Sequence, residues 1–218
     1  MITSHQGMLF VATDVAAQDE ADFNQWYDRE HVEERVRIAG FLSGTRYQSL
    51  QGGRKYLGLY KTTSLESFTS EAYHAAFTRQ TAWSVANLQK MQSPMRRVCS
   101  INAVVGHGTG SHLAIITFPA NGLSASLATD ISELGGTLFA QPGFVRSSLL
   151  LPDVALSTPL PKESPENRQL LPMMLIESSS ASASLQLAAQ ACQALDYPLS
   201  EVLQYVLGWQ LSAQEVAS

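Results

Sequence analysis

The sequence predicts an α+β protein with two βαββαβ units in tandem, whose two antiparallel sheets pack together as an α/β barrel within one chain. The order strand, helix, strand, strand, helix, strand can be followed through residues 1–106 and again through residues 107–218. Short segments also correspond between the halves: Gly40-Phe41 and Gly143-Phe144 each open an expected strand. This order is the ferredoxin-like pattern. We therefore expect a first ferredoxin-like repeat over residues 1–106 and a second, diverged repeat over residues 107–218.

The elements of the first half follow from apolar periodicity and from its breaks. Asp19 and Asp22 precede the first apolar residue of a helix, where carboxylates favour the helix dipole. Gly40 ends this helix, because a left-handed backbone costs glycine little. Thr63-Ser64 offers an N-cap for a second helix. The expected strands are 8–15, 41–50, 55–61 and 95–105, and the expected helices are 19–39 and 65–76, the latter fraying or continuing to Trp83.

The second half repeats this order with weaker signals. Residues 106–111 are a connector of small residues, and no helix opens directly after it, which excludes a dinucleotide-binding loop. Residues 152–167 are rich in Pro and Ser and predict an exposed loop, either a lid or a disordered insertion. Pro172 indicates an edge or a bulge in the strand around it. The expected strands are 112–118, 144–151, 169–177 and 201–210, and the expected helices are 124–139 and 182–195.

Each half alone would leave one apolar face of its sheet uncovered. Packing the two sheets against each other covers both faces. We therefore expect a monomer whose barrel mimics a dimer, or a homodimer formed through other surfaces.

Composition excludes several classes of protein. The net charge of -5 argues against a nucleic-acid surface. No apolar stretch approaches the ~20 residues that cross a bilayer, and no signal peptide opens the chain, so we expect a cytoplasmic protein without a membrane contact. Cys99 and Cys192 fall in apolar segments of opposite halves and are expected to be buried thiols rather than a disulfide. The five histidines are scattered, so neither a metal nor another cofactor is predicted.

The densest aromatic and ionisable cluster lies on the first helix. Phe23, Trp26, Tyr27 and His31 recur at helical spacing and share one face. His31 could transfer a proton near neutral pH, and Asp28 could orient its imidazole. The alternative for His31 is a structural histidine that ties the helix end to the next strand.

The other candidate residues each have a structural alternative. Trp26 and Tyr27 could line a pocket for a planar ligand, or belong to the core. Arg46 and Tyr47 point to opposite faces of one strand, so either could face the pocket and bind substrate there. Arg46 could hold a carboxylate, or lie on the surface. Tyr56 and Tyr60 share a face and could add hydroxyl groups to a pocket. A final alternative is a solvated face in which the carboxylates of Asp28 and Glu30 pair with Arg29, Arg35 or Arg37.

These residues carry a resemblance to a known family. Residues 23–47 and 55–77 resemble bacterial proteins of the dimeric α/β-barrel superfamily, related to EthD-like and stress-responsive A/B-barrel proteins. The resemblance covers residues 8–105 and extends over the second half only as a fold. Glu33 stands where members often have proline. The signature W-Y-D-x-E-H, Gly-Phe and Arg-Tyr stands here as Trp26, Tyr27, Asp28, Glu30, His31, Gly40, Phe41, Arg46 and Tyr47.

The resemblance implies a ferredoxin-like fold with a pocket between sheet and helices, in a superfamily that holds lactone isomerases, polyketide cyclases, small monooxygenases and haem-handling enzymes. Our first hypothesis is cofactor-independent proton transfer by His31 on an aromatic, lactone or polyketide-like acid, with Tyr27 and Arg46 binding the substrate. The alternatives are a non-catalytic ligand-binding or interaction module and a cofactor-free monooxygenase. The sequence leaves open whether the protein is an enzyme.

Overall fold

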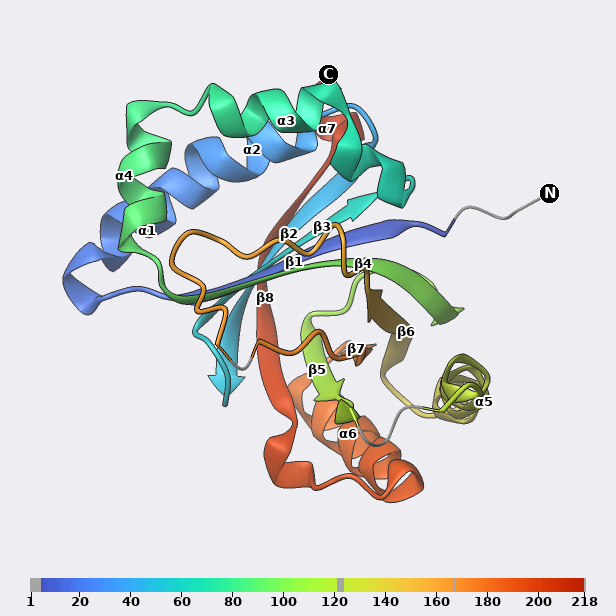
Figure 1. Ribbon diagram of the computed structural model, residues 1–218. Coiled ribbons are helices and arrows are strands. Elements are labelled where there is room, and N and C mark those ends of the chain that lie inside the picture. Colours follow the sequence, from blue (N-terminus) through green and yellow to red (C-terminus); the bar gives the residue numbers. More distant parts are fainter. Residues whose placement is uncertain (1–4, 121–123, 167, 218) are drawn as a thin grey trace.

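Eight antiparallel strands close into one barrel (Figure 1). The structure is a computed structural model that describes residues 5–120, 124–166 and 168–217. Around the barrel the strands follow the order β1-β3-β2-β8-β5-β7-β6-β4. Their bounds are β1 Gly7–Asp14, β2 Phe41–Gln51, β3 Tyr56–Thr62, β4 Gln92–Gly106, β5 His112–Thr117, β6 Phe144–Pro152, β7 Met173–Ser178 and β8 Leu203–Ser212.

The strand order shows the same topology twice. The first half contributes β4-β1-β3-β2 and the second contributes β8-β5-β7-β6, which is the same order of first, second, third and fourth strand. The two sheets join edge to edge, because β2 pairs with β8 and β4 pairs with β6. The prediction of tandem ferredoxin-like units in an intrachain barrel is confirmed. The division at residue 106 stays a prediction.

The barrel interior is a continuous apolar core. Since strand side chains alternate between faces, every second residue of each strand points inward. Leu57 and Leu59 of β3 point inward in this way, as do Met173 and Leu175 of β7. The remaining buried members of this core are Met8, Phe10, Ala12, Tyr47, Cys99, Ile101, Leu113, Ile115, Leu150 and Tyr205.

The helices of the first half cover the outer face of its sheet (Figure 1). α1 (Glu20–Trp26) continues through a π-helical turn, Tyr27–His31, into α2 (Val32–Val36). The expected second helix is instead a 3-10 turn followed by two helices, α3 (Glu71–Thr78) and α4 (Ala82–Lys90). Two caps explain the division: the side chain of Ser70 accepts from Tyr73 N, and that of Thr81 accepts from Ser84 N.

The second half carries α5 (Leu127–Phe139) and α6 (Ala181–Leu195) on its sheet, and α7 (Ala213–Ala217), which the sequence did not predict, follows β8. Part of the predicted helix 124–139 and strand 169–177 is irregular, since α5 begins at Leu127 and β7 begins at Met173, directly after Pro172. Pro172 cannot donate to a ladder, and its carbonyl accepts from Phe118 N at 2.9 Å. No helix in the described ranges is long and apolar enough to cross a membrane.

The connection between β6 and β7 returns across the first half (Figure 1). We predicted an exposed loop over residues 152–167, and this is wrong for its buried residues. Ser157 and Glu163 are buried, and Leu160 packs against the core under the first-half helices. The hydroxyl of Ser157 accepts from the N–H of Val98 in β4 and donates to its carbonyl, so this part of the connection lies beside β4 next to the end of the β4–β6 ladder.

Candidate functional site

A cavity of about 420 Å³ lies between the outer face of the first-half sheet, its helices and the β6–β7 connection. Most of its wall is apolar, as is usual for a small-molecule site, and its size falls within the range of such sites. The lining residues are Leu9, Val11, His31, Arg35, Tyr60, Phe77, Gln80, Val85, Leu88, Gln89, Met91, Pro94, Arg96, Leu160, Pro161 and Lys162.

A π-helical turn places the aromatic and ionisable side chains on this wall. The N–H of Val32 bonds the carbonyl of Tyr27, five residues back, so one extra residue is fitted into the turn. Trp26, Tyr27 and His31 are therefore all buried, and Arg35 follows on the same side. Such turns occur often at functional sites. No sequence pattern predicted this turn.

His31 lies in an aromatic box that opens on the cavity. Its ring centroid is 4.4 Å from that of Trp26 and 4.9 Å from that of Tyr27. Its Nδ1 is buried and has no hydrogen-bond partner among the described residues. Burial, followed by the positive charges of Arg35 and Arg46, holds the pKa of His31 well below its usual range. The imidazole is therefore neutral at neutral pH, and it is a weak base while the cavity is empty.

Arg35 is a cavity-lining residue that the sequence analysis did not include among the candidate site residues. We considered it a partner for Asp28 or Glu30 on a solvated face, but it is only 5% exposed and forms no ion pair within the described part of the chain. Its Nη1 is buried without a partner, and its guanidinium lies 4.8 Å from the ring centroid of Phe77. Arg35 follows His31 by four residues, so helical spacing was the available signal.

Two tyrosine hydroxyl groups complete the polar part of this region. The Tyr60 hydroxyl is buried, and no residue that the structure describes meets it in good hydrogen-bonding geometry. Burial, and then the neighbouring Tyr27, raises the pKa of Tyr60 well above its usual value. Gly58 makes room here: a Cβ at this position would lie 2.8 Å from the Tyr27 hydroxyl and 3.2 Å from the Tyr60 ring. Tyr60 lines the cavity, whereas Tyr27 is outside the lining and packs its ring against the imidazole of His31.

Asp28 and Arg46 bind each other and do not take the positions that the sequence analysis expected for them. An Asp28 Oδ1 accepts from Arg46 Nη1 at 2.5 Å and from Trp209 Nε1 at 2.7 Å, and not from His31. Arg46 also donates to Asn24 Oδ1 at 3.0 Å and lies 4.3 Å from the centroid of the Tyr27 ring. The expected orientation of His31 by Asp28 is therefore wrong in this structure. Arg46 fixes Tyr27 and lies outside the cavity lining.

The other predicted site residues divide between core and barrel. Trp26 is fully buried and donates to Ser84 Oγ at 3.0 Å, which fits its alternative as a core residue. Tyr56 and Tyr60 share the helix-facing side of β3, and Tyr56 accepts from Asn24 Nδ2 at 3.2 Å. Tyr47 points into the barrel, on the other side of the sheet from His31.

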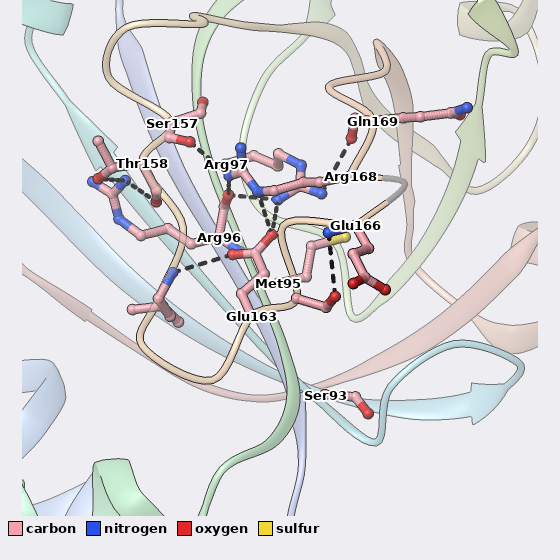
Figure 2. A network of polar contacts seen from close by, with 12 residues as sticks. Ser93, Met95, Arg96, Arg97, Ser157, Thr158, Glu163, Glu166, Arg168 and Gln169 are labelled. Atoms are coloured by element: carbon pink, nitrogen blue, oxygen red, sulfur yellow. Dashed lines mark hydrogen bonds and ion pairs between the residues drawn. The ribbon is translucent and has the colours of Figure 1, made fainter.

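A polar network anchors the β6–β7 connection as the outer wall of the cavity (Figure 2). Glu163 accepts from Arg97 and Arg168, and its second oxygen accepts from Arg96 N at 3.1 Å. Arg96 itself donates to the carbonyls of Leu156 and Thr158 and to the Tyr73 hydroxyl. This network holds the wall that carries the lining residues Leu160, Pro161 and Lys162.

Comparisons with known proteins agree with this architecture. No protein-family model and no curated protein matches the chain. An anthrone oxidase-like protein has a similar structure, with a TM-score of 0.66, 12% identity, and coverage of 98% of this chain and 95% of that one. A proposed monooxygenase from Fusobacterium nucleatum subsp. nucleatum has a TM-score of 0.60 and 9% identity, with coverage of 97% of this chain and 96% of that one. A proposed chlorite dismutase has a TM-score of 0.57 and 10% identity, with coverage of 98% of both chains. At such identities the likeness shows the fold alone. The narrower resemblance to EthD-like proteins stays a prediction.

The equivalent space in the second half is filled. Side chains of α5 and α6 meet the outer face of its sheet in an apolar cluster that includes Ile131, Leu138, Leu187 and Ala188. Within the described ranges, no group of three or more His, Cys, Asp or Glu side chains is placed to hold a metal ion. The second half therefore packs apolar side chains where the first half carries the His31 cavity.

Proposed function

We propose that the cavity beside His31 binds a small, largely apolar molecule that carries or acquires one negative charge, and that His31 takes a proton from this molecule. The observation that carries the proposal is the pair of buried, unpartnered nitrogens, His31 Nδ1 and Arg35 Nη1, on residues that line one cavity. An unpaired buried arginine is unfavourable by several kcal/mol, on the order of the penalty for a desolvated ion. An anionic ligand would supply the missing charge.

The chemistry that fits this pair is proton abstraction. A C–H or O–H bond of the ligand breaks, the proton moves to an imidazole nitrogen, and the electron pair stays on the ligand facing Arg35. The low pKa of His31 arises partly from the charge of Arg35. A ligand anion would neutralise that charge, raise the pKa of His31 and so make the imidazole a stronger base only when the site is filled. Return of the proton to another atom would complete an isomerisation or cyclisation.

Cofactor-free oxygenation is the second candidate. It is supported by two similar structures, one named anthrone oxidase-like and the other a proposed monooxygenase. The same first step would apply, since an aromatic anion formed by proton loss can pass electrons to dioxygen. The apolar wall of the cavity suits a planar aromatic ligand.

The test separates binding from turnover. Aromatic acids, lactones, short polyketide mimics and anthrones would be titrated against wild type, Arg35→Met and His31→Gln, with Arg29→Met as the matched control on the exposed side of the same helix. We expect Arg35→Met to weaken binding of anionic ligands at least tenfold, and His31→Gln to bind them but to lose turnover. Oxygen uptake would identify the second candidate. Binding without turnover would assign a ligand-binding module, and equal behaviour of Arg35→Met and Arg29→Met would refute the proposal.

A further inference from the structure

The inward-facing positions of the barrel change from apolar to charged at one end. On β3, Lys61 follows the inward Leu57 and Leu59, and on β7, Glu177 follows the inward Met173 and Leu175. Because inward positions recur every second residue, both charged side chains point into the end of the barrel. Arg146 of β6 stands opposite Glu177 in the β6–β7 ladder and reaches the same space.

These charges are not paired with one another. The described residues show no ion pair for Lys61, Arg146 or Glu177, although all three line one cavity of about 300 Å³. Glu177 Oε2 instead accepts from the N–H of Gly110 at 2.9 Å. The Nε of Arg146 is buried and has no hydrogen-bond partner in the described ranges. Two cations therefore face a space that contains one carboxylate, and one oxygen of that carboxylate accepts from the backbone.

Hydroxyl groups surround the same space. Ser43, Thr45 and Thr109 line it together with Tyr47, which the sequence analysis had assigned to the substrate pocket. Hydroxyl and guanidinium donors in one cavity are suited to an oxyanion, which accepts several hydrogen bonds at once. The volume is at the lower end of the range for small-molecule sites, which fits a small organic anion rather than a large cofactor.

We propose that this end of the barrel is a second ligand site, separate from the His31 cavity, which binds the carboxylate or phosphate group of a small organic anion through Lys61 and Arg146. Both halves build it, since Lys61 comes from β3 and Arg146 from β6. The proposal does not depend on the function assigned to His31.

The test uses inorganic phosphate and malonate as probes, with chloride at matched ionic strength as the reference. We expect a saturable rise in the melting temperature of wild type, about 5–10 °C at a probe concentration a hundredfold above its dissociation constant. The stronger of the two probes identifies phosphate or carboxylate as the preferred group. Arg146→Met and Lys61→Met should each weaken binding at least tenfold, and exposed Arg79→Met should leave it unchanged.

Glu177→Gln gives a test with the opposite sign. Its amide oxygen can still accept from Gly110, but the negative charge facing the ligand is gone, so affinity for either probe should rise severalfold. A purely structural Glu177 would not produce that gain. Loss of binding in Arg35→Met rather than in Arg146→Met would place the anion in the His31 cavity and overturn the proposal, as would a wild type that responds to phosphate and malonate only as it does to chloride.

Discussion

The wall of the His31 cavity depends on Glu163, and its replacement by glutamine gives the sharpest test of that dependence. The Glu163 carboxylate has only 6% of its side-chain surface exposed and accepts from Arg97 and Arg168. Glutamine keeps the shape but removes the charge and turns an NH₂ group towards donors. Removing one partner of a buried ion pair costs about 3–5 kcal/mol. For a chain of this length each kcal/mol lowers the melting temperature by about 2–4 °C, so we expect a loss of roughly 6–20 °C.

The assay combines thermal unfolding with limited trypsin digestion. Lys162 and Arg168 lie within the β6–β7 connection and offer cleavage sites that the native network protects. If the connection detaches before the barrel unfolds, Glu163→Gln would show faster cleavage and a smaller loss of melting temperature. Glu166→Gln is the matched control, because Glu166 is exposed on the same connection. Equal melting temperatures and equal cleavage rates for the two variants would refute the reasoning.

The same residue predicts a dependence on pH. Burial acts to raise the pKa of Glu163, but the hydrogen bonds from Arg97 and Arg168 outweigh it and hold the pKa below its usual value. The stabilisation is therefore present above the ordinary glutamate pKa of about 4.3 and is lost as pH falls through the lower folded value. The stability difference between wild type and Glu163→Gln should be full near neutral pH and should shrink below about pH 4.

Three further predictions concern the barrel and the site. Gly58→Ala should lower the free energy of unfolding by about 1–3 kcal/mol in a urea titration, because its Cβ would lie 2.8 Å from the Tyr27 hydroxyl; an unchanged midpoint would show that Tyr27 moves freely. His31 should remain neutral by NMR at pH values where a free histidine is protonated, because the pKa of His31 is depressed in the folded protein. For the same reason wild type should lose stability as pH falls below about 6.5, and His31→Gln should lose less. Cys99, whose pKa burial raises to about 12, should resist a thiol reagent near pH 8 until denaturant is added, and labelling of Cys99 in the native protein would contradict its burial.

The fold could be predicted because its signals are local. Strand alternation, glycine-terminated helices and a repeated order need only short windows of sequence, and they indicated both halves. The pairing of β2 with β8 needed more, since Arg46 and Trp209 stand opposite each other although they lie far apart in the chain. The partners of Asp28 were missed for the same reason, because one of them is Trp209.

The packing of the candidate site residues was predicted in part. The spacing of Trp26, Tyr27 and His31 indicated a shared buried face, and these side chains do pack together. The π-helical turn was beyond reach, because one hydrogen bond to the fifth residue leaves no compositional trace. Arg35 was assigned to solvent on general grounds, since arginine is rarely buried without a partner. Because Arg35 is buried without such a partner in the described ranges, it is the basis of the ligand proposal.

The two halves share a topology but differ in how the space between helices and sheet is packed. In the second half, Ile131, Leu138 and Leu187 belong to an apolar cluster that fills the space between the helices and the sheet. The same half instead sends its β6–β7 connection across the first half, where Leu160 and Pro161 become cavity wall. A separate homodimer would give each copy the same cavity and the same connection. Within one chain, the second half can do without the W-Y-D-x-E-H residues and can instead supply a wall of the first-half cavity. This is consistent with a cavity lined by ionisable residues on one side of the barrel and an apolar core on the other.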